Sequence, residues 1–552
     1  MKRISTLVLS LFSFVIANAQ WASDPALNTL AAQGQECVDP IAVADSSGNT
    51  YISYRLPNGG GYSIYMQKLD ALGYPQWGST GKLLSDDDHS QTFTTVYSMA
   101  MGPEDHAVAA WEDSRTGNFD VFASRVSSDS LLVWGNGGLQ LSFGANTDVN
   151  PQVLPMPDQS TIIAWQSDDS TGIYIQRVSA DGTRMWGQNG YLHYEHSGTG
   201  LRYFSYPRLV LCNDTSFYLL FKKANAPGFS ASQLELSINK FGLSAQSLWG
   251  GDIGFQTAGS IPFILTMNPF SDGNEGCVVA WMDGRGSGVY LDGYVQHIDP
   301  SGNSLLAPNG QDVVSVPGSL ALDNISAALD DAGNIYAFYN TSTEIYMQKV
   351  DPSGNLLLGA NGAMVVTAVN SFSQTYGQKT SRGFLINYSD DAFPVNTYSA
   401  AMFDSTGNFV WSNQILSVAT SSSGKSNATV TEEKNRQVVV AWQDDRSGTS
   451  TDIYVQNIEV NGSLGVGVPE LNQANVKVYP NPASNLITLN IPGKVTSRYT
   501  VTVLNTTGEI LRSWTGVPSM RSFDVSGLAA GVYFLRVANE KETKTLRFEV
   551  IR

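Results

Sequence analysis

The chain has 552 residues, including 52 glycines, 24 tyrosines and 23 phenylalanines, and only 15% of its residues are charged. This length exceeds the size at which one hydrophobic core stops growing, so several domains or a large repeat array are expected, and the composition favours short strands and tight turns. Residues 20–475 hold 44 acidic and 20 basic residues, whereas residues 476–552 hold 5 and 10. Because the negative charge of residues 20–475 is repelled by the phosphate backbone of nucleic acids, no nucleic-acid partner is expected.

The chain begins with a segment typical of a secretory signal peptide. Lys2 and Arg3 precede an apolar run that ends at Ala19, and a basic start, an apolar middle and a small residue at the end define such a leader. We expect cleavage between Ala19 and Gln20, so residues 1–19 are assigned to the leader. No other stretch approaches the roughly 20 apolar residues that a membrane helix requires, so no transmembrane helix is expected.

A repeat organises residues 20–465. It is clearest in VVVAWQDDRSGTSTDIYVQ (residues 438–456), where an apolar run ends in Trp442 and an Asp/Arg/Gly turn leads into a second alternating strand. The copies align on one aromatic anchor each, 50 to 60 residues apart: Tyr54, Trp111, Trp165, Phe221, Trp281, Phe338, Tyr388 and Trp442. A period of this length with about four short β runs is typical of a β-propeller. The sequence therefore predicts an all-β protein with an eight-bladed propeller, seven blades being the alternative.

The second copy illustrates the predicted blade. Its four strands are expected at residues 96–101, 107–111, 120–126 and 131–134. The fourth is expected to end in a Trp-Gly marker at Trp134, and related tryptophans occur in other copies: Trp77, Trp186, Trp249 and Trp411. The eighth copy lacks this marker, whereas the chain after the leader begins with Gln20-Trp21. We therefore expect Trp21 to complete the last blade, which closes the ring and removes exposed sheet edges.

The C-terminal part has a different character. Residues 466–475 break the repeat and are interpreted as a linker, and the short strand-like runs of residues 476–552 predict a small immunoglobulin-like β-sandwich. Three segments and the terminal residues carry a specific pattern: VKVYPNP (476–482), NTTGEIL (505–511), FDVSGLAAGVYFLRV (523–537) and residues 544–552. These closely resemble the type A C-terminal sorting domain of the bacterial type IX secretion system.

This resemblance implies a route. The leader would direct the chain to the periplasm, and the sorting domain would then direct it across the outer membrane. The implied partners are the type IX secretion machinery and a surface sortase-like protease, both acting on residues 476–552. The protein would end as a secreted or outer-membrane surface-attached molecule. The sorting signal says nothing about what the cargo does.

Charged residues recur in loops that the repeat places on one face. If the strands of a blade alternate in direction, the loop after the second strand and the connection to the next blade emerge together, and such loops often bind ligands. The candidate ligand-face residues are Asp113, Arg115, Asp120, Asp169, Asp283, Arg285, Asp444, Asp445, Arg446 and Asp452. The same loops hold Asp168, Asp292, Asp86-Asp87-Asp88-His89 and His193-Tyr194-Glu195-His196.

The repeated Asp/Arg turn has a structural explanation. Its aspartate would accept backbone N–H bonds and its arginine would pair with a carboxylate, which is a loop staple. The loops could bind calcium as a cofactor, because rim carboxylates supply the oxygens it prefers, although no loop follows the EF-hand pattern. His193 and His196 supply too few ligands for zinc, and no Ser/His/Asp set emerges from spacing.

The sequence is compatible with two functions. The first is a non-catalytic binding or adhesion module, exported by type IX secretion, that takes a surface glycan or protein ligand through its acidic rim. The alternative is a secreted glycan- or peptide-acting hydrolase with a propeller catalytic domain. Sialidases share only the fold class, since their Asp boxes place Trp after the aspartate whereas this repeat places it before, and fold alone does not assign function.

Overall fold

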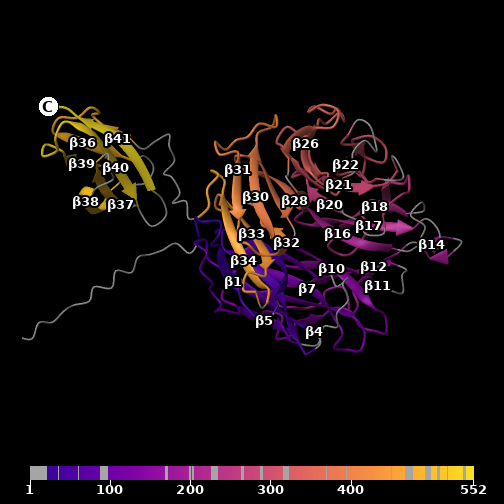
Figure 1. Cartoon of the computed structure of the whole chain (residues 1–552). Helices are drawn as coiled ribbons and strands as arrows, with labels where there is room; N and C mark the ends of the chain where they lie inside the picture. Colours follow the sequence, from indigo (N-terminus) through magenta and orange to yellow (C-terminus); the bar gives the residue numbers. More distant parts are fainter. Residues whose placement is uncertain are drawn as a thin grey trace, which may run out of the picture. The chain divides into compact units, whose positions relative to one another are not determined.

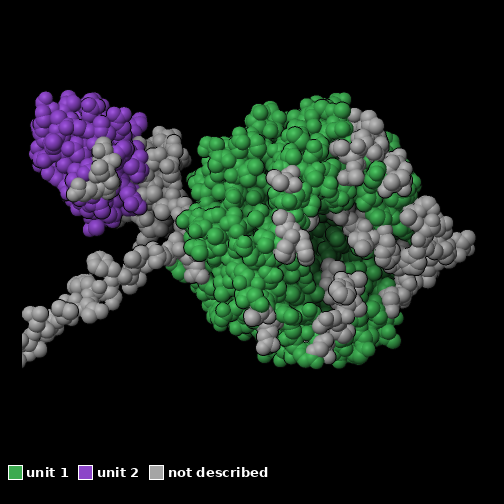
Figure 2. All heavy atoms as spheres, viewed as in Figure 1, with its two compact units in different colours: residues 1–465 green, residues 466–552 purple. Residues whose placement is uncertain are grey.

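The computed structural model describes residues 21–34, 36–59, 61–86, 97–167, 172–194, 196–197, 200–201, 204–224, 234–262, 267–285, 290–314, 322–367, 370–392, 395–448, 450–465, 477–491, 499–505, 510–518, 520–538 and 543–552. The leader, its predicted cleavage position and the predicted linker lie outside these residues. The chain divides into two compact units, residues 1–465 and residues 466–552, coloured separately in Figure 2.

Unit 1 is built from four-stranded antiparallel sheets, eight of them among the described residues. The first four are β2–β5 (Val38–Ala44, Thr50–Asn58, Gly61–Leu69, Lys82–Ser85), β6–β9 (Ser98–Met101, Ala107–Asp113, Asp120–Val126, Leu139–Gln140), β10–β13 (Asp148–Pro155, Thr161–Ser167, Gly172–Val178, Tyr191–Tyr194) and β16–β19 (Phe204–Asn213, Ser216–Ala224, Leu234–Gly242, Ile253–Gln256).

The next three are β20–β23 (Met267–Ser271, Cys277–Asp283, Asp292–Ile298, Gln311–Asp312), β24–β27 (Asn324–Leu329, Ile335–Asn340, Glu344–Val350, Ala363–Thr367) and β28–β31 (Ser371–Thr380, Gly383–Ala392, Val395–Phe403, Ile415–Ala419). The last sheet joins β32–β34 (Lys425–Val430, Gln437–Asp444, Asp452–Glu459) to β1 (Thr29–Ala32). A short hairpin, β14 (His196–Ser197) and β15 (Gly200–Leu201), and one 3-10 turn (Pro103–Asp105) complete the elements of unit 1 that the structure describes.

Asx turns connect many of these strands. In the turn after β26, one carboxylate oxygen of Asp351 accepts the backbone N–H groups of Ser353 and Asn355, both at 2.9 Å. Gly354 has a φ of 85°, a conformation that glycine adopts without steric cost. The same Asp-x-x-Gly-Asn pattern closes the turns at Asp45, Asp299, Asp330 and Asp404, so turn chemistry sets the up-and-down order of the strands.

The eight sheets form a closed, propeller-like ring. The first strands β2, β6, β10, β16, β20, β24 and β28 contact one another in succession, and β32 contacts both β30 and β2. Figure 1 shows the indigo strand β1 beside the orange strand β34, and β1 pairs antiparallel with β34 from Thr29 opposite Val455. The predicted closure by the two ends of the repeat region is thus present, but the pairing strand is β1 and not the segment at Trp21.

The Trp-Gly markers do not end the fourth strands, and that prediction is wrong. Residues 131–134 fold back on the third strand through a bridge between Val126 and Leu132, and the fourth strand follows only at β9. The apolar run is used for packing, because its indole reaches the next sheet. Trp134 donates to the carbonyl of Ala180 at 3.2 Å, and four other markers make the same contact: Trp186 to Leu243, Trp249 to Pro300, Trp411 to Val460 and Trp21 to Ala71.

The core of unit 1 is divided among the interfaces between neighbouring sheets. One cluster joins Val108 and Trp134 of sheet β6–β9 to Ile163 and Trp165 of sheet β10–β13, all of them buried. Each sheet buries both faces in this way, so its strands are rich in apolar residues throughout. The anchor tryptophans Trp111, Trp165, Trp281 and Trp442 are fully buried, as expected for packing residues.

Unit 2 is a small β-sandwich. One sheet contains β35 (Lys477–Tyr479), β36 (Leu486–Asn490) and β39 (Met520–Asp524); the other contains β38 (Ile510–Val517), β37 (Tyr499–Leu504), β40 (Gly531–Ala538) and β41 (Thr543–Val550). Buried residues of both sheets, including Leu489, Val501 and Leu535, share one core. The terminal Arg552 donates to the carbonyls of Ser526 and Leu528. Within the described part of the chain, no helix has the length and apolar character needed to span a membrane.

Candidate functional site

Three of the Asp/Arg turns share one arrangement at the end of the second strand. In the eighth copy, Asp444 is fully buried and accepts the indole N–H of Trp442 at 2.9 Å. Its two oxygens also accept the backbone N–H of Arg446 at 3.0 Å and the Arg446 guanidinium at 2.6 Å. Both carboxylate oxygens are therefore used within the turn.

The second and fifth copies repeat these contacts. Asp113 is bonded to the indole of Trp111 at 3.3 Å, and Asp283 to that of Trp281 at 2.9 Å. The arginine then lies over an aromatic ring of the third strand: Arg115 over Phe122 at 4.1 Å, Arg285 over Tyr294 at 3.6 Å and Arg446 over Tyr454 at 3.8 Å. Each arginine is held on two sides, so the geometry is that of the predicted loop staple.

The pKa values of two motif aspartates shift in opposite directions. Burial opposes ionisation of both Asp283 and Asp444. At Asp444 the hydrogen bonds from Arg446 and Trp442 outweigh burial and lower the pKa below its usual value. At Asp283 the Arg285 Nε atom stays 3.2 Å away, burial dominates, and the pKa is raised.

The second set of predicted aspartates lies opposite the first. Asp113 pairs in register with Asp120, Asp283 with Asp292 and Asp444 with Asp452. Asp120 accepts the Ser142 hydroxyl at 3.1 Å and the Gln140 amide at 3.2 Å. Asp452 accepts the backbone N–H of Gly34 at 3.2 Å, so it fixes the segment that follows the closing strand β1.

The fourth copy replaces one of the two register-paired acids by a lysine. Lys223 and Glu235 occupy the register pair that two aspartates occupy elsewhere, and the Lys223 Nζ atom lies 3.2 Å from Glu235 and 3.8 Å from Asp252. His193 of the preceding sheet completes this buried cluster with its Nε2 atom 2.9 Å from Asp252. Phe204, Phe221 and Phe241 surround the imidazole. His193 thus belongs to a buried polar cluster, and nothing is described of the His196 side chain.

The predicted site residues are not brought together. The three complete Asp/Arg staples belong to three different sheets: β6–β9, β20–β23 and the sheet of β1 with β32–β34. Two sheets lie between the first and second staples and two between the second and third, whereas only β2–β5 lies between the third and the first. Asp445 differs from the others, because it is exposed and accepts the backbone N–H of Gly424 at 2.7 Å. With Glu36 and Thr451 it lines a depression of about 370 Å³, which we call the loop-side depression. Asp168, Asp169, Asp87, Asp88, His89 and Glu195 lie outside the described residues.

A larger depression, of about 920 Å³, opens at the other ends of the second strands. We call it the turn-side depression, because the turns between first and second strands line it in four consecutive sheets: Phe270–Asn274, His297, Ala327–Asp331, Gly333, Gln378–Ser381, Glu432 and Glu433. Since the first strands surround the axis of the ring, these turns lie around its centre. Figure 2 shows unit 1 hollowed in the middle.

Carboxylates outnumber basic groups in the lining of the turn-side depression. Asp331 forms an ion pair with Lys379 at 2.6 Å, and both side chains are exposed. Glu433 accepts the backbone N–H and the hydroxyl of Ser381 at 2.5 and 2.7 Å. Glu432 lies 3.3 Å from Lys434, and 84% of its side chain is exposed. Exposed pairs of this kind contribute little stability, so these carboxylates are accessible to a competing cation.

The same depression contains a histidine held by an aspartate. The Nε2 atom of His297 lies 2.8 Å from the Asp272 carboxylate, which also accepts the backbone N–H groups of Asn274 and Gly276. These hydrogen bonds outweigh burial and lower the pKa of Asp272. Other copies place a basic residue at this point of the third strand: Lys68, Arg125, Arg177, Lys240 and Lys349. Arg177 likewise pairs with Asp158 of its own turn. The His297–Asp272 pair is therefore a variant of a contact between the third strand and the turn that precedes the second strand.

The turn-side depression was not predicted. Its acidic residues lie in Asp/Gly/Asn turns, where a carboxylate is usually a turn former, and only the ring brings four such turns together. The doubled acids Asp330-Asp331 and Glu432-Glu433 were the available signal, because an Asx turn needs only one of them. Among the residues described, no group of three or more His, Cys, Asp or Glu is arranged to hold a metal ion.

Residues 477–551 match the family model described as a secretion system C-terminal sorting domain. They correspond to unit 2, and the resemblance to the type IX sorting domain is confirmed. The chain is therefore a type IX secreted protein, with secretion and cell-surface attachment through that system. No curated protein matches the chain.

Several solved structures are similar to the chain at low identity. A puromycin hydrolase mutant in complex with PGG is 9% identical with a TM-score of 0.41, over 77% of this chain and 61% of that one. A protein of unknown function from Dyadobacter fermentans is 10% identical with a TM-score of 0.37, over 80% and 98%. The α-L-arabinofuranosidase from Fusarium graminearum with an iminosugar inhibitor is 9% identical with a TM-score of 0.33, over 79% and 99%. The chain thus spans less than two thirds of the hydrolase, and no activity is transferred from these proteins.

Proposed function

We propose that unit 1 is an eight-bladed propeller that binds a ligand without catalysis at the cell surface, and that the ligand occupies the turn-side depression. The eight four-stranded sheets and their closed order of contacts support the blade count. The depression carries the functional proposal, because it is larger than the loop-side depression and its exposed carboxylates Asp331 and Glu432 are held only by single surface ion pairs.

The charge of the lining selects the class of ligand. Five carboxylates, Asp272, Asp330, Asp331, Glu432 and Glu433, face the depression together with Lys379 and His297. The surrounding body is also strongly acidic, so its field attracts cations and repels anions. A protein segment rich in lysine and arginine fits this lining better than an acidic glycan.

Paired charge-neutralising variants test the proposal. The double variant Asp331→Asn with Glu432→Gln removes two exposed carboxylates of the turn-side depression. Its control, Glu36→Gln with Asp445→Asn, removes two from the loop-side depression. Calorimetric titration of the mature chain with an oligolysine peptide should show binding about 10-fold weaker in the first variant, equivalent to ~1.4 kcal/mol, and unchanged in the control. Equal losses, or no binding by the native chain, would overturn the assignment.

A hydrolase remains the second candidate, and the Asp272–His297 pair is the observation that favours it. A histidine oriented by a buried carboxylate can act as a general base if a substrate proton lies within reach. His297→Gln should then abolish turnover of a glycan or peptide substrate. If the native chain turns over no member of a glycan and peptide panel, this candidate is removed, whereas the binding proposal is unaffected.

Export of the chain involves two proposed cleavages, and its acidic loops are a proposed calcium site. We propose that the leader is removed between Ala19 and Gln20, that a sortase-like protease cleaves in residues 466–475, and that the outer-membrane surface is the final location. Calcium binding at the acidic loops is retained as a proposal. Titration with Ca²⁺ that leaves the melting temperature unchanged would dismiss it, because a ligand specific for the folded state must raise that temperature.

A further inference from the structure

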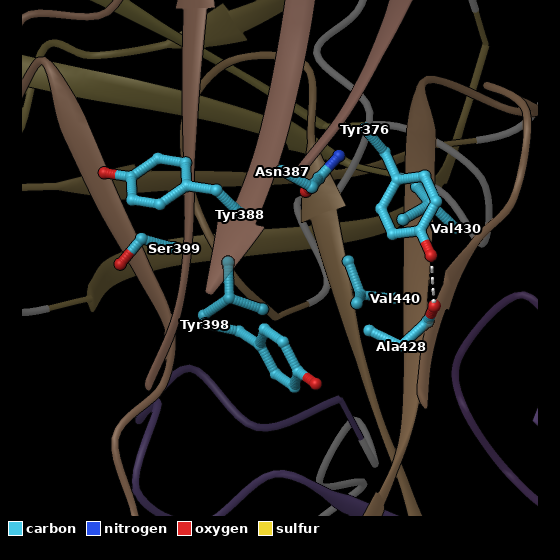
Figure 3. Close-up of a pocket in the computed structure, with 9 residues that line it drawn as sticks. Tyr376, Asn387, Tyr388, Tyr398, Ser399, Ala428, Val430 and Val440 are labelled. Atoms are coloured by element: carbon cyan, nitrogen blue, oxygen red, sulfur yellow. Dashed lines mark hydrogen bonds between the residues drawn. The ribbon is translucent and has the colours of Figure 1, made fainter. Parts of the chain in front are cut away.

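Neighbouring sheets of the ring are joined by single polar contacts as well as by apolar packing. Between sheets β28–β31 and β32–β34, the Tyr376 hydroxyl donates to the carbonyl of Ala428 at 3.0 Å (Figure 3). Between sheets β16–β19 and β20–β23, the Tyr218 hydroxyl donates to the carbonyl of Glu275 in the same way. A thiol reaches that same carbonyl, since the Cys212 Sγ atom lies 3.4 Å from it. A sulfur atom therefore lies at the turn-side edge of this interface.

A second thiol faces the same interface from the opposite sheet. Cys277 begins β21, and alternate residues of a strand point to opposite faces of its sheet. Cys277 and Val279 belong to the core cluster shared with sheet β16–β19, whereas Val278 belongs to the next cluster along the ring. Cys212 of β16 belongs to the former cluster. The two cysteines thus enter one buried layer from its two sides.

The repeat brings these two positions together in another interface as well. Cys212 lies nine residues before the aromatic anchor of its copy, and Cys277 lies four residues before that of the next copy. In the preceding interface the same two positions hold Met156 and Phe217, and both residues belong to one core cluster. The register of β16 with β17 shifts at Cys212, so the strand can adjust there to the specific geometry that a disulfide requires.

Electrostatics distinguish this pair from the third thiol. Burial raises the pKa of Cys277, and the neighbouring Asp272 and Cys212 groups raise it further. Burial also raises the pKa of Cys37, to about 12, but there the second cause is Asp452. Cys37 directly precedes β2, in the sheet next to the ring closure. Cys212 and Cys277 are therefore the two thiols that influence one another.

The route of the chain determines what these thiols become. All three cysteines are free thiols in the structure, but a type IX secreted protein passes through the periplasm, where disulfides form and persist. We propose that Cys212 and Cys277 form a disulfide in the exported protein, which joins sheets β16–β19 and β20–β23 covalently at their turn-side ends. This inference is independent of the proposed ligand.

The oxidant is a disulfide of the periplasm. The thiolate of one cysteine attacks the S–S bond of the oxidant, which gives a mixed disulfide and releases one thiolate. The thiolate of the second cysteine then attacks the sulfur of the first, and the other half of the oxidant leaves. The two cysteine protons end on the two oxidant sulfurs, so the cysteines lose two electrons and the oxidant gains them. Because both cysteines are buried in the folded chain, the bond forms before the interface has packed.

Counting thiols in the exported chain tests the proposal. The native chain is collected without reductant, denatured, alkylated with N-ethylmaleimide and weighed by mass spectrometry. It should carry one adduct, at Cys37, and three adducts after prior reduction with a phosphine. Without reduction, Cys277→Ala should carry two adducts, because Cys212 has lost its partner, and Cys37→Ala should carry none. Peptide mapping should recover a linked peptide that contains Cys212 and Cys277.

A count of three adducts in the unreduced native chain would overturn the disulfide. A linkage that involves Cys37 or a small thiol would overturn it equally. If the variants are not exported, the native chain alone decides, because the adduct count and the linked peptide require no substitution.

Discussion

Trp442 donates its indole N–H to Asp444 across 2.9 Å at the end of β33, and Trp281 makes the same bond to Asp283 at the end of β21. In each case the donor is the aromatic anchor of the copy and the acceptor is the aspartate of its charged turn. The tryptophan that packs the sheet interface therefore also fixes the loop that follows it. This relationship explains why Trp, Asp and Arg recur together at a spacing of two residues.

Removing the shared carboxylate should destabilise unit 1 severely. In Asp444→Ala the Arg446 guanidinium and the Trp442 indole both lose their buried acceptor. Breaking a buried pair at one partner costs about 3–5 kcal/mol, because the remaining charge is left uncompensated. Thermal unfolding of the full chain should show a markedly lower melting temperature. The neighbouring variant Asp445→Ala alters an exposed carboxylate with one backbone contact and should cost less than about 1 kcal/mol.

Closure of the ring should depend on Trp21. Its indole is buried and donates to Ala71 at 3.0 Å, and its backbone N–H reaches the carbonyl of Leu72. Trp21→Ala should cost about 3–5 kcal/mol, as expected for truncating a buried tryptophan. Leu27→Ala is the control, because Leu27 is 66% exposed and surface changes stay within about 0.5 kcal/mol. Similar melting temperatures for the two variants would show that the first residues are dispensable for closure.

The sequence predicted the repeat and the ring closure because both depend on spacing. An anchor every 50–60 residues and a missing marker in the eighth copy need no side-chain geometry. The fourth strands were misplaced because Val133-Trp134 resembles a strand end, whereas its indole is used to contact the next sheet. Local periodicity cannot distinguish an apolar run that pairs from one that packs across an interface.

The candidate site was less accessible from sequence. The staple at Asp113, Asp283 and Asp444 could be inferred from sequence, because a motif that recurs in several copies is expected to stabilise a loop that those copies share. The exchange at Lys223 was readable in an alignment of the copies, because a lysine stands two residues after the aromatic anchor there, where the staple copies have an aspartate. The turn-side depression requires the ring, which brings turns separated by about fifty residues around one centre.

Deleting residues 477–552 should trap the chain in the periplasm, because these residues match the sorting domain. Cell fractionation should find the truncated chain inside the outer membrane and the native chain outside it. The terminal variant Arg552→Ala loses the bonds to Ser526 and Leu528 that fasten the end of unit 2, and export should fall several-fold. Mass spectrometry of the native exported form should give a chain that starts at Gln20. Export of the truncated chain at the native level would contradict the assignment.

Glu459 should give unit 1 a measurable pH dependence. The residue lies on β34, 9% of its surface is exposed, and burial raises its pKa from the ordinary 4.5 to about 7, against the opposing charge of Arg436. The folded state therefore holds a proton that the unfolded chain has released at pH 6. Stability is full below the unfolded pKa and is lost as the pH rises from about 4.5 through 7, by about 3 kcal/mol at 1.36 kcal/mol per pKa unit.

Two variants separate this group from the many other acids of the chain. Glu459→Gln is neutral at every pH, so its melting temperature should exceed that of the native chain at pH 8 and approach it at pH 5. Arg436→Ala removes the charge that opposes the shift, so its loss of stability should move to higher pH. Melting curves from pH 5 to 8 provide the measurement. A Glu459→Gln profile parallel to the native one would mean that Glu459 is ionised in the folded state throughout this range.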